Sequence, residues 1–125
     1  MIKTMKQTVI WIDDERNPHS DVWNSVATNK KYIQGDPSIV WLVNYWEFCN
    51  WLDTAVHDTE VLWPSFVCFD HDLGGEKTGL DCAKYLVDVC MKHALPLPAY
   101  TCHSSNPAGR ENILSYLNSY KKSLE

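Results

Sequence analysis

Two acidic clusters in this chain each follow a run of apolar residues directly. Asp13-Asp14 follows the run Val9–Ile12, and Asp70-His71-Asp72 follows the run Phe66–Phe69. Apolar runs of this length are typical of buried strands in parallel sheets. If the two strands are neighbours, four carboxylates and one histidine meet at one sheet edge. Carboxylates that lie so close together repel one another and usually need a cation or a shared proton. The pattern therefore indicates a metal-assisted site that binds an anion, and phosphate is the anion that we favour.

Three of these carboxylates have the character of ligands for a hard cation. Asp13, Asp14 and Asp70 offer oxygen atoms, and Mg²⁺ prefers oxygen ligands while keeping several waters, so two or three carboxylates suffice. We therefore predict that they hold Mg²⁺ or Mn²⁺. The alternative for Asp13 and Asp14 is a turn or a helix cap.

Two histidines and one further acid are candidates for proton transfer. His103 follows the last predicted strand beside small hydroxyl residues, and a positioned histidine commonly transfers protons near neutral pH. His71 could donate a proton or bind phosphate, and Asp72 could assist a metal ligand or donate a proton. The alternatives are a hydrogen bond to a loop for His103, a structural role for His71 and a loop cap for Asp72.

A phosphate-binding set is predicted around the start of the last helix. Free amides at a helix start, together with the positive end of the helix dipole, bind phosphate well. The set comprises Ser104, Ser105, Asn106, Gly109 and Arg110, with Arg16 from the first loop. An ordinary helix cap at Asn106 and a solvated surface position for Arg16 are the alternatives.

The elements that must position these residues alternate between strand and helix. Strands are predicted at Thr8–Ile12, Ile39–Val43, Phe66–Phe69 and Ala99–Cys102. Helices are predicted after caps at Asn44, Thr78 and Asn106, with a short one over residues 20–27. This alternation predicts a three-layer, doubly wound α/β fold with a parallel sheet. In strand order 2-1-3-4 the switch point, where open α/β sheets bind ligands, lies between the first and third strands.

Length and composition limit the class of protein. The 125 residues suit a single domain over 1–125, and the net charge of −5 argues against broad binding to nucleic acid. Five cysteines without a CxxC pair indicate reduced core residues. The sequence shows neither a signal peptide nor an apolar stretch of membrane-spanning length, so we expect a cytoplasmic protein that does not enter a membrane. The tryptophans are predicted to pack in the core, and the oligomeric state is left open.

Four short motifs resemble the cyclic-phosphate-processing receiver-like domain, a relative of the response-regulator receiver domain. They are Trp11–Pro18, Phe69–Gly74, Thr78–Asp81 and His103–Gly109. The resemblance implies a receiver-like fold and action on a cyclic phosphate, either at RNA ends or derived from nucleotides.

The resemblance to ordinary receivers is incomplete. By resemblance, Asp13 and Asp14 match the acid pair of receivers, and Asp70 matches their phosphoacceptor. Receivers have a fifth βα unit that supplies a lysine, whereas this chain is predicted to have four units. His71 and His103 are what an ordinary receiver lacks and what hydrolysis would need.

The favoured interpretation is a metal-dependent phosphoesterase that opens a small cyclic phosphate. One alternative is an aspartate-nucleophile phosphatase, because Phe69–Asp72 resembles the apolar strand and DxD motif of haloacid dehalogenases, where the first Asp attacks phosphorus. The other is a degenerate, non-catalytic receiver that binds a partner protein or a nucleotide.

Overall fold

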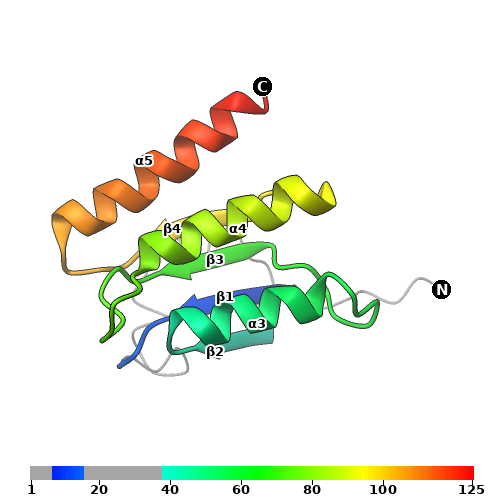
Figure 1. The fold of residues 1–125 in the computed structure, drawn as a ribbon, viewed down its shortest axis with the longest axis horizontal. Helices are drawn as coiled ribbons and strands as arrows, with labels where there is room; N and C mark the ends of the chain where they lie inside the picture. Colours follow the sequence, from blue (N-terminus) through cyan, green and yellow to red (C-terminus); the bar gives the residue numbers. More distant parts are fainter. Residues whose placement is uncertain (1–6, 16–37) are drawn as a thin grey trace.

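The sheet has four parallel strands in the order β2-β1-β3-β4, as predicted. The computed structural model describes residues 7–15 and 38–125. The strands are β1 (Thr8–Ile12), β2 (Ser38–Leu42), β3 (Phe66–Phe69) and β4 (Ala99–Cys102). All four arrows in Figure 1 point the same way, so the carboxyl ends of the strands share one edge. The switch point between β1 and β3 is therefore where the sequence predicted it.

The second strand begins and ends one residue earlier than predicted. Ser38 pairs with Thr8, and its N–H donates to the carbonyl of Gln7 at 2.8 Å. At the other end the N–H of Val43 donates to the Glu47 side chain at 3.1 Å, so Val43 belongs to the cap of the next helix.

The three described helices begin at the predicted caps. They are α3 (Tyr45–Ala55), α4 (Gly79–His93) and α5 (Pro107–Ser123). Asn44 accepts from the N–H of Glu47 at 2.9 Å, and the N–H of Thr78 donates to Asp81 at 2.8 Å. Such caps satisfy the amides that a helix start leaves without an intrahelical partner. The short helix predicted over residues 20–27 lies outside the described residues.

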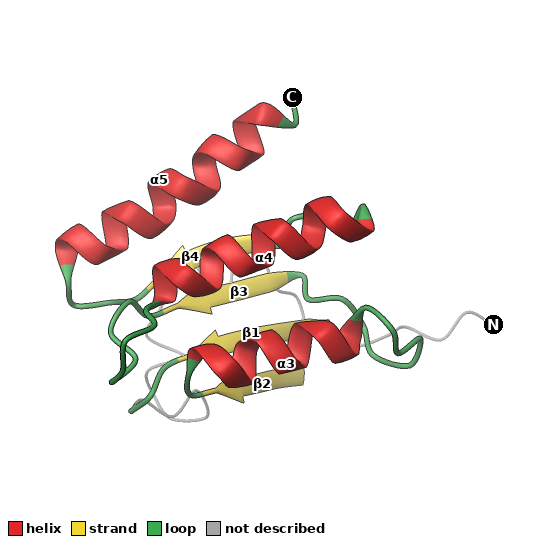
Figure 2. Ribbon diagram, in the orientation of Figure 1, coloured by secondary structure: helices red, strands yellow, loops and turns green. Residues whose placement is uncertain are grey.

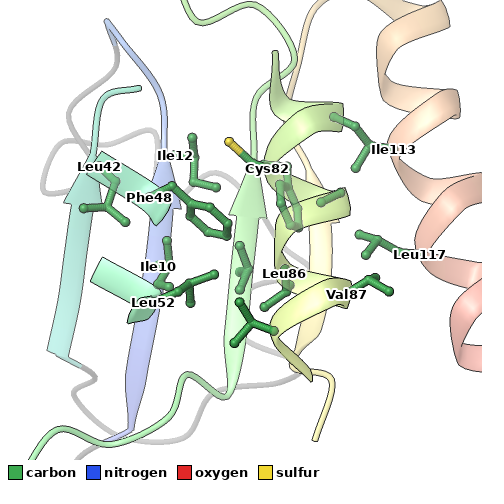
Figure 3. Close-up of a cluster of buried hydrophobic side chains, with 14 of the residues drawn as sticks. Ile10, Ile12, Leu42, Phe48, Leu52, Cys82, Leu86, Val87, Ile113 and Leu117 are labelled. Atoms are coloured by element: carbon green, nitrogen blue, oxygen red, sulfur yellow. The ribbon is translucent and has the colours of Figure 1, made fainter. Parts of the chain in front are cut away.

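The helices α3, α4 and α5 share one buried core with the sheet. Figures 1 and 2 show α3 and α4 lying across the sheet, with α5 running beside α4. In Figure 3, Phe48 and Leu52 of α3 face Ile10 and Ile12 of β1. On α4 and α5 the buried stripe contains Cys82, Leu86, Val87, Ile113 and Leu117. Each large apolar side chain buried in this way contributes roughly 1.5–3 kcal/mol.

The opposite face of the sheet is also buried. Val9, Trp11, Phe66 and Cys68 form a second cluster, each with no exposed surface. Side chains alternate between the two faces of a strand, so Trp11 points away from Ile10 and Ile12. Both faces of the two central strands, β1 and β3, therefore exclude water, as in a doubly wound α/β fold.

Some of the predicted core positions are wrong. Trp46, on the first turn of α3, is 63% exposed, and Trp41 of β2 is 38% exposed. Ala94 ends α4 in the left-handed conformation (φ 54°) and is exposed. Some apolar side chains of these elements therefore lie on the surface.

The cysteines match the expectation of free core thiols. All five are free and buried. Burial raises the pKa of the Cys90 thiol to about 11, and it raises the pKa of Cys68 and Cys82 further. These thiols therefore behave as apolar core groups. Within the described part of the chain, no helix is both long and apolar enough to cross a membrane.

Candidate functional site

The site is built on backbone that continues the sheet beyond its strands. The N–H of Asp13 donates to the carbonyl of Leu42 at 3.1 Å, and the N–H of His103 donates to the carbonyl of Phe69 at 2.9 Å. Both bonds extend the parallel ladders by one residue. Asp13, Asp70 and His103 thus stand directly after β1, β3 and β4, on adjacent strands.

These three residues form a compact cluster with the chemistry of a divalent-cation site. One carboxylate oxygen of Asp13, one of Asp70 and a ring nitrogen of His103 all lie within 4.8 Å of one another. The Nε2 atom of His103 is 2.9 Å from Oδ2 of Asp13, and Asp13 and Asp70 are 1% and 8% exposed. Ligand atoms sit about 2.0–2.2 Å from a common Mn²⁺- or Zn²⁺-like cation. Two carboxylates and an imidazole at this spacing fit such an ion after small side-chain adjustments.

Neighbouring groups fix the orientation of Asp13 and His103. The Trp11 ring stacks on the His103 ring, with 4.0 Å between centroids and 5° between planes. The Nε1–H of Trp41 donates to the carbonyl of Asp13 at 2.7 Å, and the N–H of Glu15 donates to its Oδ1 at 2.9 Å. Trp11 is buried in the core as predicted, but its stacking on His103 and the contact of Trp41 with Asp13 were not predicted. Trp11 and Asp13 are two residues apart and so share one side of the extended chain, which was the available signal.

A cavity of about 260 Å³, here called the acid cavity, opens beside the cluster. Its lining residues are Asp13, Asp14, Glu15, Asp70, Asp72, Gly74 and Ser105. Asp14 is exposed there rather than joining the three clustered residues. The predicted acids Asp14 and Asp72 therefore face the space that a substrate would enter, while Asp13 and Asp70 lie deeper.

His71 packs against the start of α5. It is half-buried, and a Cβ atom added to Gly109 would lie 2.3 Å from Cγ of the His71 ring. Among the described residues, those that line the acid cavity do not include His71. The structure therefore places the His71 ring against the start of α5 rather than among the residues that line the acid cavity.

The amides predicted to cradle phosphate are engaged in the helix cap. The N–H of Gly109 donates to Oδ1 of Asn106 at 3.0 Å, and the N–H of Arg110 donates to the Asn106 carbonyl at 2.9 Å. Ser104 is buried and its Oγ accepts from the N–H of Asn106 at 3.1 Å, which leaves Ser105 at the cavity. The Arg110 residue is exposed, and Arg16 lies outside the described residues.

A close backbone approach joins α4 to the acidic loop. The N–H of Gly79 donates to the carbonyl of His71 at 2.9 Å, and a Cβ atom on Gly79 would lie only 1.9 Å from the carbonyl oxygen of Asp70. Only glycine allows the helix start to come this near. Gly79 therefore helps to place the backbone that carries Asp70.

Two solved structures that are similar to this chain share its fold at low sequence identity. One is a mutant of the receiver domain of the histidine kinase CKI1 from Arabidopsis thaliana, with a TM-score of 0.56 and 12% identity, covering 87% of this chain and 75% of that one. Another is a yeast Spc42 trimeric coiled-coil segment fused to a second protein, with a TM-score of 0.55 and 14% identity over 91% of this chain. The chain spans 64% of that fusion. Identities this low show the receiver-like fold alone.

The comparison with protein families identifies the family as well as the fold. No curated protein matches the chain. A family model, described as the cyclic-phosphate processing receiver domain, matches residues 8–119. That span includes all four strands, most of α5 and the clustered residues Asp13, Asp70 and His103. The chain therefore belongs to the family of cyclic-phosphate processing receiver domains.

Proposed function

We propose that this chain is a metal-dependent phosphoesterase that opens a small cyclic phosphate. The observation that carries the proposal is the cluster of Asp13, Asp70 and His103, with ligand atoms within 4.8 Å of one another at the floor of the acid cavity. Membership of a family named for cyclic-phosphate processing supports the substrate class. The substrate is a nucleotide-derived cyclic phosphate or an RNA end that carries one.

Asp13, Asp70 and His103 hold the cation, which is Mn²⁺ or Mg²⁺. When bound, the cation neutralises the phosphate oxygens and lowers the pKa of a water. Because an imidazole nitrogen belongs to the set, Mn²⁺ suits it better than Mg²⁺, which favours oxygen ligands. We place His103 among the ligands because its Nε2 lies 2.9 Å from Oδ2 of Asp13; proton transfer by His103 stays the alternative.

The remaining acids of the cavity handle the substrate and its protons. Asp72, exposed at the acid cavity, accepts a proton from the attacking water. The oxygen of that water bonds to phosphorus, one P–O ester bond of the ring breaks, and the leaving oxygen takes a proton from solvent. The hydroxyl of Ser105 lines the same cavity and is placed to donate to a phosphate oxygen.

Turnover of a panel of cyclic phosphates tests the proposed function. The protein is first freed of metal with a chelator and then incubated with nucleoside 2′,3′-cyclic phosphates or glycerol cyclic phosphate. Mg²⁺ or Mn²⁺ is added afterwards, and ³¹P NMR follows the products. We expect ring opening that needs added metal and is faster with Mn²⁺. Tight binding without any turnover would instead favour the non-catalytic receiver.

The ligand role of His103 predicts a defect in metal binding as well as in rate. His103→Gln should weaken Mn²⁺ binding roughly 10- to 100-fold or more, since even residues that only support metal ligands have effects of that size. Electron paramagnetic resonance of free Mn²⁺ measures the affinity without any substrate. His93→Gln, an exposed histidine at the end of α4, is the matched control. Unchanged Mn²⁺ affinity with a reduced kcat would return His103 to the proton-transfer role.

A further inference from the structure

A second and larger cavity adjoins the acid cavity. It holds about 400 Å³ and lies between the first residues of α3 and the loop that follows β3. Gly74 lines both cavities, so they meet at that residue. We call the second one the aromatic cavity, because Tyr45 and Trp46 form part of its wall.

The aromatic cavity presents one large ring to solvent. Trp46 is 63% exposed, whereas Phe48 and Leu52 make the core contacts of α3. The helix therefore packs on the sheet without the Trp46 indole. An exposed tryptophan beside a cavity is better explained by a ligand than by packing, since indole rings are mostly buried.

The neighbouring side chains hold this wall in place and add a positive charge. The Tyr45 ring meets the Trp46 ring edge-on, with centroids 4.9 Å apart and planes at 82°. A hydrogen bond with Cys49, together with burial, raises the pKa of Tyr45 to about 12. The Nζ atom of Lys77 lies 5.4 Å from the centroid of the Tyr45 ring. The cavity thus combines an exposed aromatic face with a cation, as sites for nucleotides do.

Gly74 is the residue that the two cavities share, and only a residue without a side chain fits there. Its φ is +75°, and a Cβ atom there would lie 3.0 Å from Oδ2 of Asp14. A side chain at this position would crowd the carboxylate that faces the substrate. A nucleoside cyclic phosphate carries its base and its phosphate on two sides of one ribose, so it can occupy both cavities at once across Gly74.

We propose that the aromatic cavity is a nucleobase site, in which the base stacks on Trp46 while the cyclic phosphate reaches the acid cavity. The position of the cyclic phosphate in the acid cavity rests on the proposed function, whereas the position of the base on Trp46 does not. The nucleobase site selects nucleotide substrates over cyclic phosphates that lack an aromatic ring. Lys77 stands near the base or its ribose, and stacking makes the site tolerant of base identity.

Equilibrium binding tests the nucleobase site without any turnover. Isothermal titration with adenosine 2′-monophosphate and with inorganic phosphate compares Trp46→Ala with the wild type. Trp46→Ala should weaken binding of the nucleotide roughly 5- to 150-fold, the range that base stacking supplies, and should leave phosphate binding unchanged. Trp46→Phe should restore most of the affinity. Met91→Ala, which removes an equally exposed apolar side chain from α4, is the control.

Each result has one meaning for the proposal. Equal nucleotide affinity in Trp46→Ala and the wild type overturns it, and so does an equal loss for nucleotide and phosphate. A change in sedimentation of Trp46→Ala, without a change in nucleotide affinity, assigns Trp46 to a protein interface and also overturns it. A nucleotide-specific loss in a chain that never opens cyclic phosphates supports the base site and rejects the proposed chemistry.

A second probe distinguishes the two sources of the base. A short oligoribonucleotide with a terminal phosphate is titrated beside the mononucleotide. If Trp46→Ala weakens both and the wild type binds them equally, the ligand is a free nucleotide. If the oligonucleotide binds more tightly and is weakened at least as much, the ligand is an RNA end. Both of these results support the nucleobase site.

Discussion

Asp70→Asn is expected to lower kcat/KM for a nucleoside cyclic phosphate roughly 100- to 1,000-fold, the scale on which a single electrostatic group in an active site acts. The substitution removes one of the two clustered carboxylates and should weaken Mn²⁺ binding as well. In the absence of metal the two acids repel each other. The free energy of unfolding, measured in urea without metal, should therefore stay within about 1 kcal/mol of the wild type or rise.

The Asp70 experiment also separates the two enzymatic readings. Asp88→Asn, on the exposed side of α4, should leave both rate and metal affinity unchanged. Wild-type turnover by Asp70→Asn would rule out the proposed mechanism. A lost rate with unchanged Mn²⁺ affinity, together with a burst and a phosphorylated Asp70 in the wild type, would instead establish the aspartate as a nucleophile.

Gly79→Ala is expected to be the most destabilising glycine-to-alanine change in the described part of the chain. The added Cβ would lie 1.9 Å from the carbonyl oxygen of Asp70 and 3.0 Å from Cδ1 of Ile113. Backbone cannot give way as a flexible side chain can, so α4 must move away from the loop. Overpacking of this kind destabilises by about 1–3 kcal/mol, occasionally more, and urea unfolding measures it. The displaced Asp70 should also bind Mn²⁺ more weakly.

Gly75→Ala is the matched control for Gly79→Ala. A Cβ atom on Gly75 would meet nothing within 4 Å. Its unfolding free energy should equal that of the wild type or exceed it by about 0.4–1 kcal/mol, because alanine restricts the unfolded chain. Equal urea midpoints for Gly79→Ala and Gly75→Ala would contradict the steric explanation.

The sheet could be read from the sequence because its strands carry an unambiguous signal. Val9–Ile12 and Phe66–Phe69 are apolar on both faces, as buried parallel strands must be. The helices were less certain at their ends. Periodicity tells which side of a helix is apolar, but not how far the core extends along it. Trp46 lies on the first turn of α3, so it was placed in a core that does not reach it.

Of the three clustered residues, the sequence predicted Asp13 and Asp70 as metal ligands, but it also named Asp14 and gave His103 a role in proton transfer. Asp13, Asp70 and His103 come together because their strands are neighbours. Contacts between distant segments carried no such signal: the approach of Gly79 to Asp70 depends on how α4 packs. Free amides and capped amides also look alike in a sequence. The engagement of Gly109 by Asn106 became visible only with the side chains in place.

The two ladder bonds beyond β1 and β4 have an entropic consequence for ligand affinity. Fixing the backbone of one residue opposes folding by about 1–2 kcal/mol, and the sheet already fixes Asp13 and His103 through Leu42 and Phe69. A cation bound as we propose would therefore find the backbone of these two residues already fixed and would have little chain to order. Little of the binding free energy of the metal would then be lost to ordering the chain, as in other preorganised sites. Added metal should therefore raise the free energy of unfolding by nearly the whole of that binding free energy.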